Sequence, residues 1–433
     1  MRQPNNHMSA VPREAELGGT RLKQSRAGPS NDLDRGIAAV EDWIVDGLPD
    51  WNNRLLGGTA SVQAFADELR ARLDPILKVS LLELARADRE LAREALAMLA
   101  FCACSIERAT QTAGEDPGEG VTLVPGLGDA MTALAVPAQM PPNLSVAGYW
   151  TANTRARWLS FTGDPQERFF RDMVNAICEQ HAVAVEYLEI LKQVRLTSTL
   201  AADLLRAAAD SQRKVKHSYT RFRNTPERRH LEMTIDFFKN IMRTFLVAFP
   251  VNGVMWQSAN AANVVEQTLL DFMIGVVDDD YVKHVQERMR YMAPEEREAI
   301  LAAMRSPSVL DRILDELSLT PHDVVAMPVD ALATRLGARP EMRRTLQAFR
   351  DFKEWAAAAS GAHFGLIIEY LVKSEDGTGG RRAVDPGHGT GGRTHAETKR
   401  VQEMRAKHPV AHKLCLATKL AWASAGEAQE LAA

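Results

Sequence analysis

The sequence predicts an all-α protein with a small N-terminal helical domain and a larger C-terminal helical domain. Apolar residues recur at intervals of three and four over most of the chain, which is the spacing of an amphipathic helix. Period-two alternation, which is typical of a half-buried strand, is scarce. With 433 residues, the chain is long enough for one large or two medium-sized domains whose core can enclose a ligand.

The N-terminal part begins with a stretch that has no helical pattern. Residues 1–35 are rich in Asn, Pro, Gly, Arg and Ser, and we interpret them as a disordered leader. Leucines then recur at helical spacing, most clearly over 81–99, until the Gly-, Pro- and Asp-rich stretch 112–128 interrupts the pattern. Residues 36–162 are therefore predicted to form a small helical domain followed by a connecting segment.

Residues 163–422 are predicted to form the larger domain. Asp164 can cap a helix that has Pro165 in its first turn. Residues 423–433 are interpreted as a tail. Further helices are expected at 197–222, 228–249, 259–275, 278–292, 294–304 and 341–373.

Composition excludes several classes of partner. The net charge of -4 argues against a nucleic-acid surface, and the longest apolar stretches are too short to cross a membrane. The N-terminus has no apolar signal core, so a cytoplasmic protein is expected. The cysteines are too few and too scattered for a disulfide framework, and the pair at 102 and 104 is expected to be buried packing. They are Cys102, Cys104, Cys178 and Cys415.

The predicted helix 341–373 carries the most informative residue. His363 has mostly alanine, isoleucine, leucine and phenylalanine as neighbours, with Gly361 and Gly365 on either side. Small residues let a flat macrocycle approach a helix, and a neutral imidazole in a dry pocket is a good axial ligand for haem iron. On this helix alone, a core histidine bonded to a carbonyl group explains the pattern better.

A glycine-rich segment follows this helix. The tetrapeptide Gly-Thr-Gly-Gly occurs at 377–380 and again at 389–392. Glycine permits positive φ, so such a run can direct several backbone N–H groups at one anion, for example an amino-acid carboxylate or a haem propionate. No phosphate-binding loop is completed, because no Lys-Ser/Thr follows. Either copy alone is equally explained as a flexible hinge.

Taken in order along the chain, these segments resemble the indoleamine 2,3-dioxygenase family. In that family, a histidine on a long C-terminal helix is followed by an aliphatic stretch, an inserted loop, GTGG and a polar helix. Here the order is His363, 364–372, the loop, 389–392 and 394–407. Residues 288–301 and 306–310 are also similar to the family's MRRYMPP and NPSV segments. The resemblance covers roughly residues 140–410.

The resemblance implies roles for individual residues. His363 would be the protein ligand of the iron in haem b. Phe238 would pack on the substrate ring, and Arg243 would meet the substrate carboxylate through its planar guanidinium. The second glycine tetrapeptide would close the haem and substrate site through Gly389, Thr390, Gly391 and Gly392.

The resemblance is weaker at two positions near the haem. On the distal face, where the family has a serine or a histidine, alignment gives Met173, or Asn175 in a second register. His181 is a rival for this place, although we expect it to face solvent or the core. The turn that the family builds from Gly, Ser and Ala reads Asn260, Ala261 and Ala262 here.

The resemblance implies an enzyme that uses haem and O2 on a small aromatic substrate. The favoured reaction adds both oxygen atoms across the indole C2–C3 bond of tryptophan or a related indole, giving an N-formylkynurenine-type product. Two alternatives stay open. One is an oxygenase of secondary metabolism, similar to monodechloroaminopyrrolnitrin synthase or the haem-dependent tyrosine hydroxylases, and the other is a haem sensor or helical scaffold without turnover.

Two remaining patterns have simpler interpretations. His408 and His412 are four residues apart and could share a metal, but no carboxylate accompanies them, so a surface pair is preferred. The acidic run 278–280 is interpreted as a helix start, since acidic residues favour the first turn of a helix. The oligomeric state is not predicted.

Overall fold

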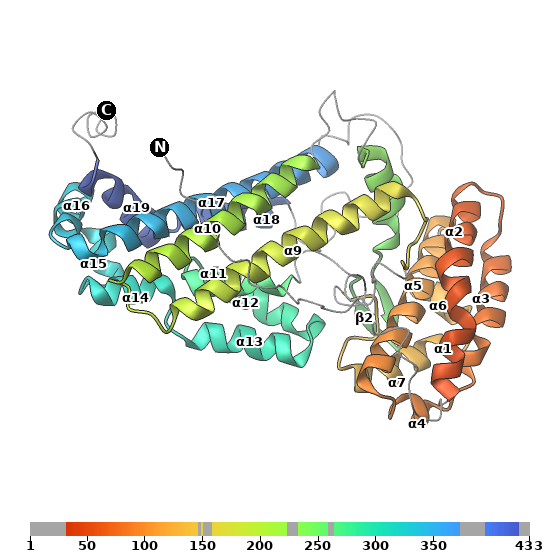
Figure 1. Cartoon of the computed structure of the whole chain (residues 1–433). Coiled ribbons are helices and arrows are strands. Elements are labelled where there is room, and N and C mark those ends of the chain that lie inside the picture. The colour runs from red at the N-terminus through yellow and green to blue at the C-terminus, as the bar shows by residue number, and fades with distance from the viewer. Residues whose placement is uncertain are drawn as a thin grey trace, which may run out of the picture.

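The computed structural model describes residues 32–145, 149, 158–222, 233–258, 264–372 and 395–423. These residues are overwhelmingly helical, which confirms the prediction of an all-α fold. The strands of this described part are β1 (Phe249–Val251) and β2 (Val254–Trp256). Figure 1 shows a bundle of shorter helices at one side of the molecule and an array of long helices at the other.

The N-terminal bundle is built around one long central helix, α5 (Arg89–Ala113). Asp88 caps its start by accepting hydrogen bonds from the backbone N–H groups of Glu90 and Leu91, and Gly114, with a φ of 97°, ends it. The other helices are α1 (Asp32–Asp42), α2 (Leu48–Leu56), α3 (Val62–Leu77), α4 (Leu81–Leu84), α6 (Glu119–Thr122) and α7 (Leu127–Ala138). The first of them begins inside the range expected to be a leader, and residues 1–31 lie outside the described residues.

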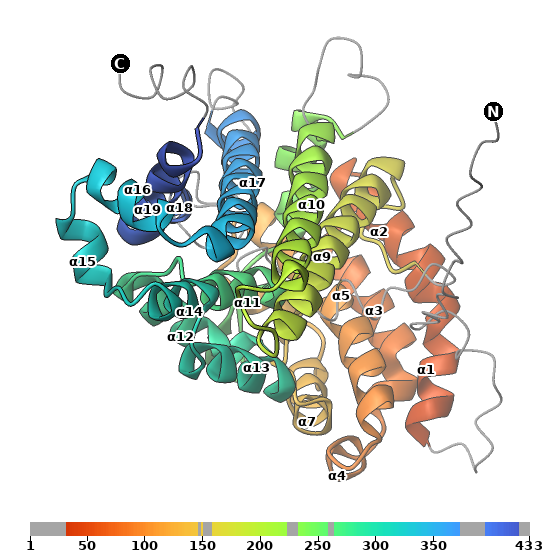
Figure 2. The ribbon, with the colours of Figure 1, turned by 60° about the vertical axis from the view of Figure 1, so that its left-hand side comes forward.

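The larger part of the molecule is organised by three long helices. These are α9 (Pro165–Leu191), α10 (Thr199–Arg221) and α17 (Arg343–Ile367), which lie side by side in Figures 1 and 2. The other helices of this part are shorter. They are α11 (Val265–Ile274), α12 (Asp279–Arg288), α13 (Pro294–Arg305), α14 (Val309–Glu316), α15 (Pro321–Ala326), α16 (Val329–Gly337), α18 (His395–Lys407) and α19 (Pro409–Ala421).

Two predicted helix starts are confirmed. Asp164 accepts a hydrogen bond from the N–H of Gln166 at 2.7 Å and caps α9, whose first residue is a proline. Asp278 accepts from the N–H of Tyr281 at 2.7 Å and caps α12. In both places a side-chain oxygen bonds an N–H group that has no partner within its own helix.

The helix expected over 228–249 is shorter than predicted. Helical turns end at Phe245, and the chain then forms the β1–β2 hairpin, in which Val251 pairs with Val254. Its turn residues Asn252 and Gly253 have φ values of 48° and 77°, as a two-residue hairpin turn requires. The Asn-Gly pair is a strong hairpin signal that the apolar periodicity concealed.

The segment around this hairpin ties the two parts of the molecule together. Phe245 and Phe249 are fully buried in the core of the N-terminal bundle, and Arg108 of α5 donates a hydrogen bond to Thr244 at 2.9 Å. A segment after residue 240 thus belongs to the core of the N-terminal bundle. The predicted division of the chain into two domains near residue 162 stays a prediction.

Three smaller expectations can be compared with the structure. All four cysteines are free thiols, and Cys102 and Cys104 are completely buried, as predicted. His408 serves as the N-cap of α19. Over the described ranges, no helix combines the length and apolarity that crossing a membrane requires.

Candidate active site

A cavity of about 220 Å³ lies among the long helices. Its walls come from α9, α10, α11, α17 and α18 and from the short π-helical turn η3 (Phe237–Ile241). Most lining side chains are aliphatic or aromatic, with a few polar groups among them. Such a composition suits an aromatic or macrocyclic ligand that is oriented by a small number of polar contacts.

His363 projects into this cavity from the second half of α17. The first half of the helix is packed through Leu346, Phe349 and Phe352, whereas the side chains from residue 361 to 369 are only half-buried. The imidazole stacks on the ring of Tyr219 from α10, with ring centroids 5.0 Å apart and 29° between the planes. This stacking orients the imidazole at the cavity wall.

The helix surface beside His363 is open. A Cβ atom built at Gly361 would meet only the side-chain nitrogen of Gln402, at 4.0 Å. The glycine therefore leaves room for a flat ligand to approach the helix backbone.

One end of the cavity is aromatic. Phe238 packs edge-to-face on Tyr370 at 5.6 Å and lies 5.8 Å from the ring of Phe170. The single hydroxyl hydrogen of Tyr370 is shared between the backbone carbonyl oxygens of Phe222, at 2.7 Å, and Met233, at 3.0 Å. Since these bonds satisfy the hydroxyl, Tyr370 contributes its ring to the cavity.

Two π-helical turns supply these aromatic side chains. Phe238 lies in η3, and Tyr370 lies in η8 (Ile368–Val372), which continues α17 beyond His363. Single π turns inside helices are frequent at functional sites.

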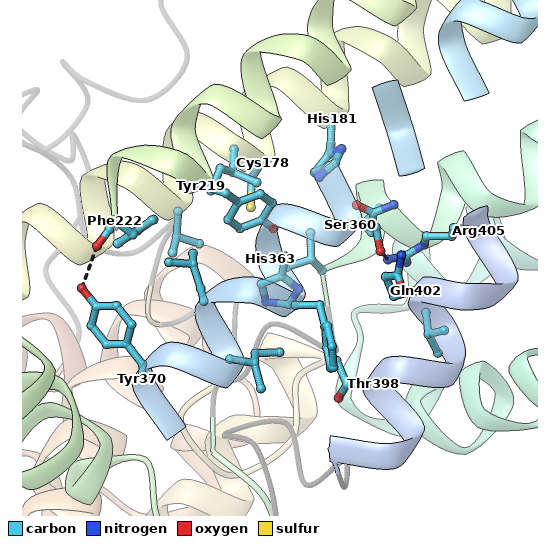
Figure 3. A pocket seen from close by; sticks show the side chains of 18 of the residues that line it. Cys178, His181, Tyr219, Phe222, Ser360, His363, Tyr370, Thr398, Gln402 and Arg405 are labelled. Atoms are coloured by element: carbon cyan, nitrogen blue, oxygen red, sulfur yellow. Dashed lines mark hydrogen bonds between the residues drawn. The ribbon is translucent and has the colours of Figure 1, made fainter. Parts of the chain in front are cut away.

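The other end of the cavity is polar. Figure 3 shows His181, Ser360, Gln402 and Arg405 on the side opposite Phe222 and Tyr370. The Arg405 guanidinium donates to both carboxylate oxygens of Asp271, the shortest contact being 2.6 Å, and to the Ser360 hydroxyl at 3.3 Å. The Tyr281 hydroxyl donates to Asp271 at 2.6 Å.

This ion pair is buried. The side chains of Arg405 and Asp271 are 12% and 5% exposed. Burial by itself lowers the pKa of the Arg405 guanidinium, but the Asp271 carboxylate and Tyr281 outweigh burial and raise the pKa above its ordinary value. Arg405 is therefore a permanent cation whose charge is matched by its partner.

His181 of α9 lines the same polar end. The side chain is 1% exposed, and Nδ1 lies 3.3 Å from the side-chain nitrogen of Gln212 on α10. Burial lowers the His181 pKa to about 3, with smaller contributions from the nearby Arg405 and His363. The imidazole is thus neutral. It is buried, as the expected core position requires, and it also lines the cavity, as the rival interpretation of His181 near the haem requires.

The structure brings some of the predicted site residues together and separates others. His363 and Phe238 both line the cavity. Arg243 is buried in the 3-10 turn η4 (Met242–Phe245), which packs against α5 of the N-terminal bundle, and it does not line the described cavity. Met173 is buried in a neighbouring apolar cluster, and Asn175 is half-buried; neither lines the cavity.

The remaining predicted residues lie outside the described residues. They are Asn260, Ala261, Ala262, Gly389, Thr390, Gly391 and Gly392.

The face of α9 that lines the cavity was not recognised from the sequence as a single surface. It is formed at intervals of four, three, one and three residues by Phe170, Val174, Ile177, Cys178 and His181. Of these, the sequence singled out His181 alone, as a rival for the distal face. Tyr219 and the Arg405–Asp271 pair had no local signal, because each meets its partner across more than a hundred residues of chain.

Comparison with known protein families identifies a related family. The family model described as "Monodechloroaminopyrrolnitrin synthase PrnB" matches residues 38–329, about two thirds of the chain. The matched range includes Phe238 and His181 and ends before His363. No curated protein matches the chain.

Proposed function

Since the chain belongs to the PrnB family, a family of haem-dependent oxygenases, we propose that it oxidises a tryptophan-type indole with haem and O2. The observation that supports this proposal best is the position of His363. Its imidazole stands on an apolar cavity wall between an aromatic end and a polar end. An amino acid with an indole side chain has the same division into an aromatic and a polar part.

The side chains that line the cavity suit haem b by their chemistry, because an imidazole stands on an apolar wall with polar groups at one end. His363 would hold the iron through an imidazole nitrogen, and the open surface at Gly361 would accept one edge of the macrocycle. When bound, haem supplies the activation of O2 that no protein side chain provides. The apolar walls exclude water from the reaction, which protects reactive species from side reactions.

The other residues would position the substrate. Phe238 and Phe170 offer ring surfaces on which an indole can stack in an offset or edge-to-face arrangement. Tyr370 would border the same space with its ring, its hydroxyl being held by two backbone carbonyls. Holding the indole in one orientation lowers the entropic part of the barrier.

Two reactions fit this site. The resemblance of residues 288–301 and 306–310 to the indoleamine 2,3-dioxygenases supports insertion of both oxygen atoms across the indole C2–C3 bond. The family match supports the alternative, a haem-dependent oxidation other than C2–C3 cleavage, as in a monodechloroaminopyrrolnitrin synthase. Incubation of the reduced haem protein with tryptophan and ¹⁸O2 separates them, because dioxygenation adds two labelled atoms to the product and a different mass change supports the alternative.

The haem ligand is tested by absorption spectroscopy. After loading with haem, the wild type should show the Soret band of a histidine-ligated haem, and His363→Ala should lose this band or show a haem affinity lower by at least about tenfold. His412→Ala is the control, since His412 lies exposed on α19, away from the cavity. Identical spectra for wild type and His363→Ala would contradict the proposal, and haem binding without any turnover of indoles would favour a sensor.

A further inference from the structure

We propose that the polar end of the cavity binds a carboxylate and that His181 donates a hydrogen bond to it. The inference rests on the proposed function, because both expected ligands carry carboxylates: an amino acid has its α-carboxylate, and haem b has two propionates. It adds a residue for which neither the family resemblance nor the family match provides a role.

The tautomer of His181 follows from its neighbour. The Gln212 amide presents its nitrogen to Nδ1 at 3.3 Å, so the amide N–H donates and Nδ1 accepts. The neutral ring then carries its hydrogen on Nε2. For this atom the structure gives no hydrogen-bond partner within the described residues, although the side chain is 1% exposed and lines the cavity. A buried donor of this kind gains most from a ligand that supplies an acceptor.

The groups beside His181 are also donors. Ser360 accepts a hydrogen bond from Arg405 through Oγ, which leaves its hydroxyl hydrogen available. The Gln402 amide lines the same end of the cavity. The oxygens of Asp271 are occupied by Arg405 and Tyr281, so they offer little to a ligand amine. A cluster rich in donors and balanced in charge favours a carboxylate over an ammonium group.

The same geometry argues against His181 as a second iron ligand. Iron binds the lone pair of an imidazole nitrogen, and the lone pair on Nδ1 is engaged by Gln212. Nε2 carries the hydrogen in this arrangement. His181 would therefore meet the carboxylate, and His363 would meet the iron.

The test compares ligands with and without a carboxylate. The haem-loaded protein is titrated calorimetrically with L-tryptophan and with tryptamine, which lacks the carboxylate. The haem-free protein is titrated with haem and with haem dimethyl ester, in which both propionates are blocked. The variants are His181→Ala, His181→Gln and Gln212→Met, with His412→Ala as the control on a distant surface.

We expect His181→Ala to weaken binding of one carboxylate ligand by about tenfold to a hundredfold, the effect of losing a hydrogen bond to a charged group. Binding of the matched ligand without the carboxylate should change little. His181→Gln should recover most of the affinity, because its amide N–H reaches the region of Nε2. Gln212→Met should show a smaller, equally carboxylate-selective loss, because the imidazole is then free to rotate.

Each outcome has a distinct meaning. Selective loss for tryptophan assigns His181 to the substrate carboxylate, and selective loss for haem over its ester assigns it to a propionate. Equal losses for both members of each pair, or none, would overturn the inference, as would a His181→Ala spectrum showing that an iron ligand had been removed. A wild type that binds haem but no indole would contradict the proposed function alone, since the haem pair still tests His181. A wild type that binds neither would overturn both.

Discussion

Helices α5 and α17 have the same length and serve opposite purposes. Each has 25 residues, but eighteen residues of α5 are buried and only eight of α17. The N-terminal bundle surrounds α5 on all sides, and even Ser105 and Glu107 are completely enclosed. The second half of α17 instead leaves its side chains half-buried along the cavity. One helix uses its surface for stability, and the other keeps apolar surface available for a ligand.

The composition of the two helices does not explain this difference. Both helices are rich in alanine, which alternates with larger apolar residues over 95–104 in α5 and forms an uninterrupted run over 356–359 in α17. The neighbours decide: α5 is covered by α3, α6 and α7, whereas the far part of α17 faces the space between α9 and α18. The following experiments test this contrast, from the largest expected effect to the smallest.

Matched phenylalanine truncations should separate the two helices. Phe101 of α5 is completely buried against Phe161 and Tyr149, so Phe101→Ala should lower the free energy of unfolding by about 3–5 kcal/mol. Phe364 of α17 is half-buried at the cavity, and Phe364→Ala should cost about 1 kcal/mol. Urea unfolding followed by circular dichroism measures both, and equal losses would contradict the contrast.

The buried ion pair at the polar end should matter more than a surface pair. Asp271→Asn leaves the Arg405 charge without its partner inside the protein, and we expect a loss of about 3 kcal/mol. Asp280, whose side chain is 68% exposed, pairs with Arg400 at 3.1 Å, so Asp280→Asn should cost less than about 1 kcal/mol. Thermal unfolding of the haem-free variants tests this, and a loss for Asp271→Asn no larger than that for Asp280→Asn would contradict the prediction.

Haem binding should stabilise the helices around the cavity and leave the N-terminal bundle almost unchanged. Haem at about one hundred times its dissociation constant should add about 2.7 kcal/mol to the free energy of unfolding of the wild type. His363→Ala should lose at least about half of this gain, because a tenfold weaker affinity leaves about 1.4 kcal/mol. Its haem-free stability should stay close to that of the wild type. Hydrogen exchange should show the added protection in α9, α17 and α18 rather than in α5. Equal protection in both regions would mean that the bundle also responds to the ligand.

The smallest effect concerns the cap of α19. Burial, with a smaller contribution from Lys353, lowers the pKa of His408, whose Nδ1 accepts from the N–H of Ala411 at 3.4 Å. The unfolded chain therefore takes up this proton first as the pH falls, so stability is complete above pH 6.5 and declines below it. His408→Asn keeps a capping acceptor that does not titrate, and its unfolding free energy should decline less between pH 7 and 5, by up to about 1 kcal/mol. The same decline in both proteins would contradict this role.

Part of the fold was predictable because helices are local. The spacing of apolar residues and the caps at Asp164 and Asp278 involve residues within one or two turns, and they located α9 and α12. His363 stood out for the same reason, as a histidine with apolar neighbours on a single helix. The β1–β2 hairpin was equally local, but its Asn-Gly turn was overlooked within an apolar stretch.

The sequence by itself therefore determined the helical class and most of the long helices, and it singled out His363, one of the two histidines that line the cavity within the described residues. Only the tertiary structure decided which helix faces surround the cavity. It brought Gln212 to His181 and Asp271 to Arg405, and it turned Arg243 away from Phe238. The physical reason is range: helical periodicity is set by neighbours within four residues, whereas the polar end of the cavity joins side chains that lie up to 134 positions apart.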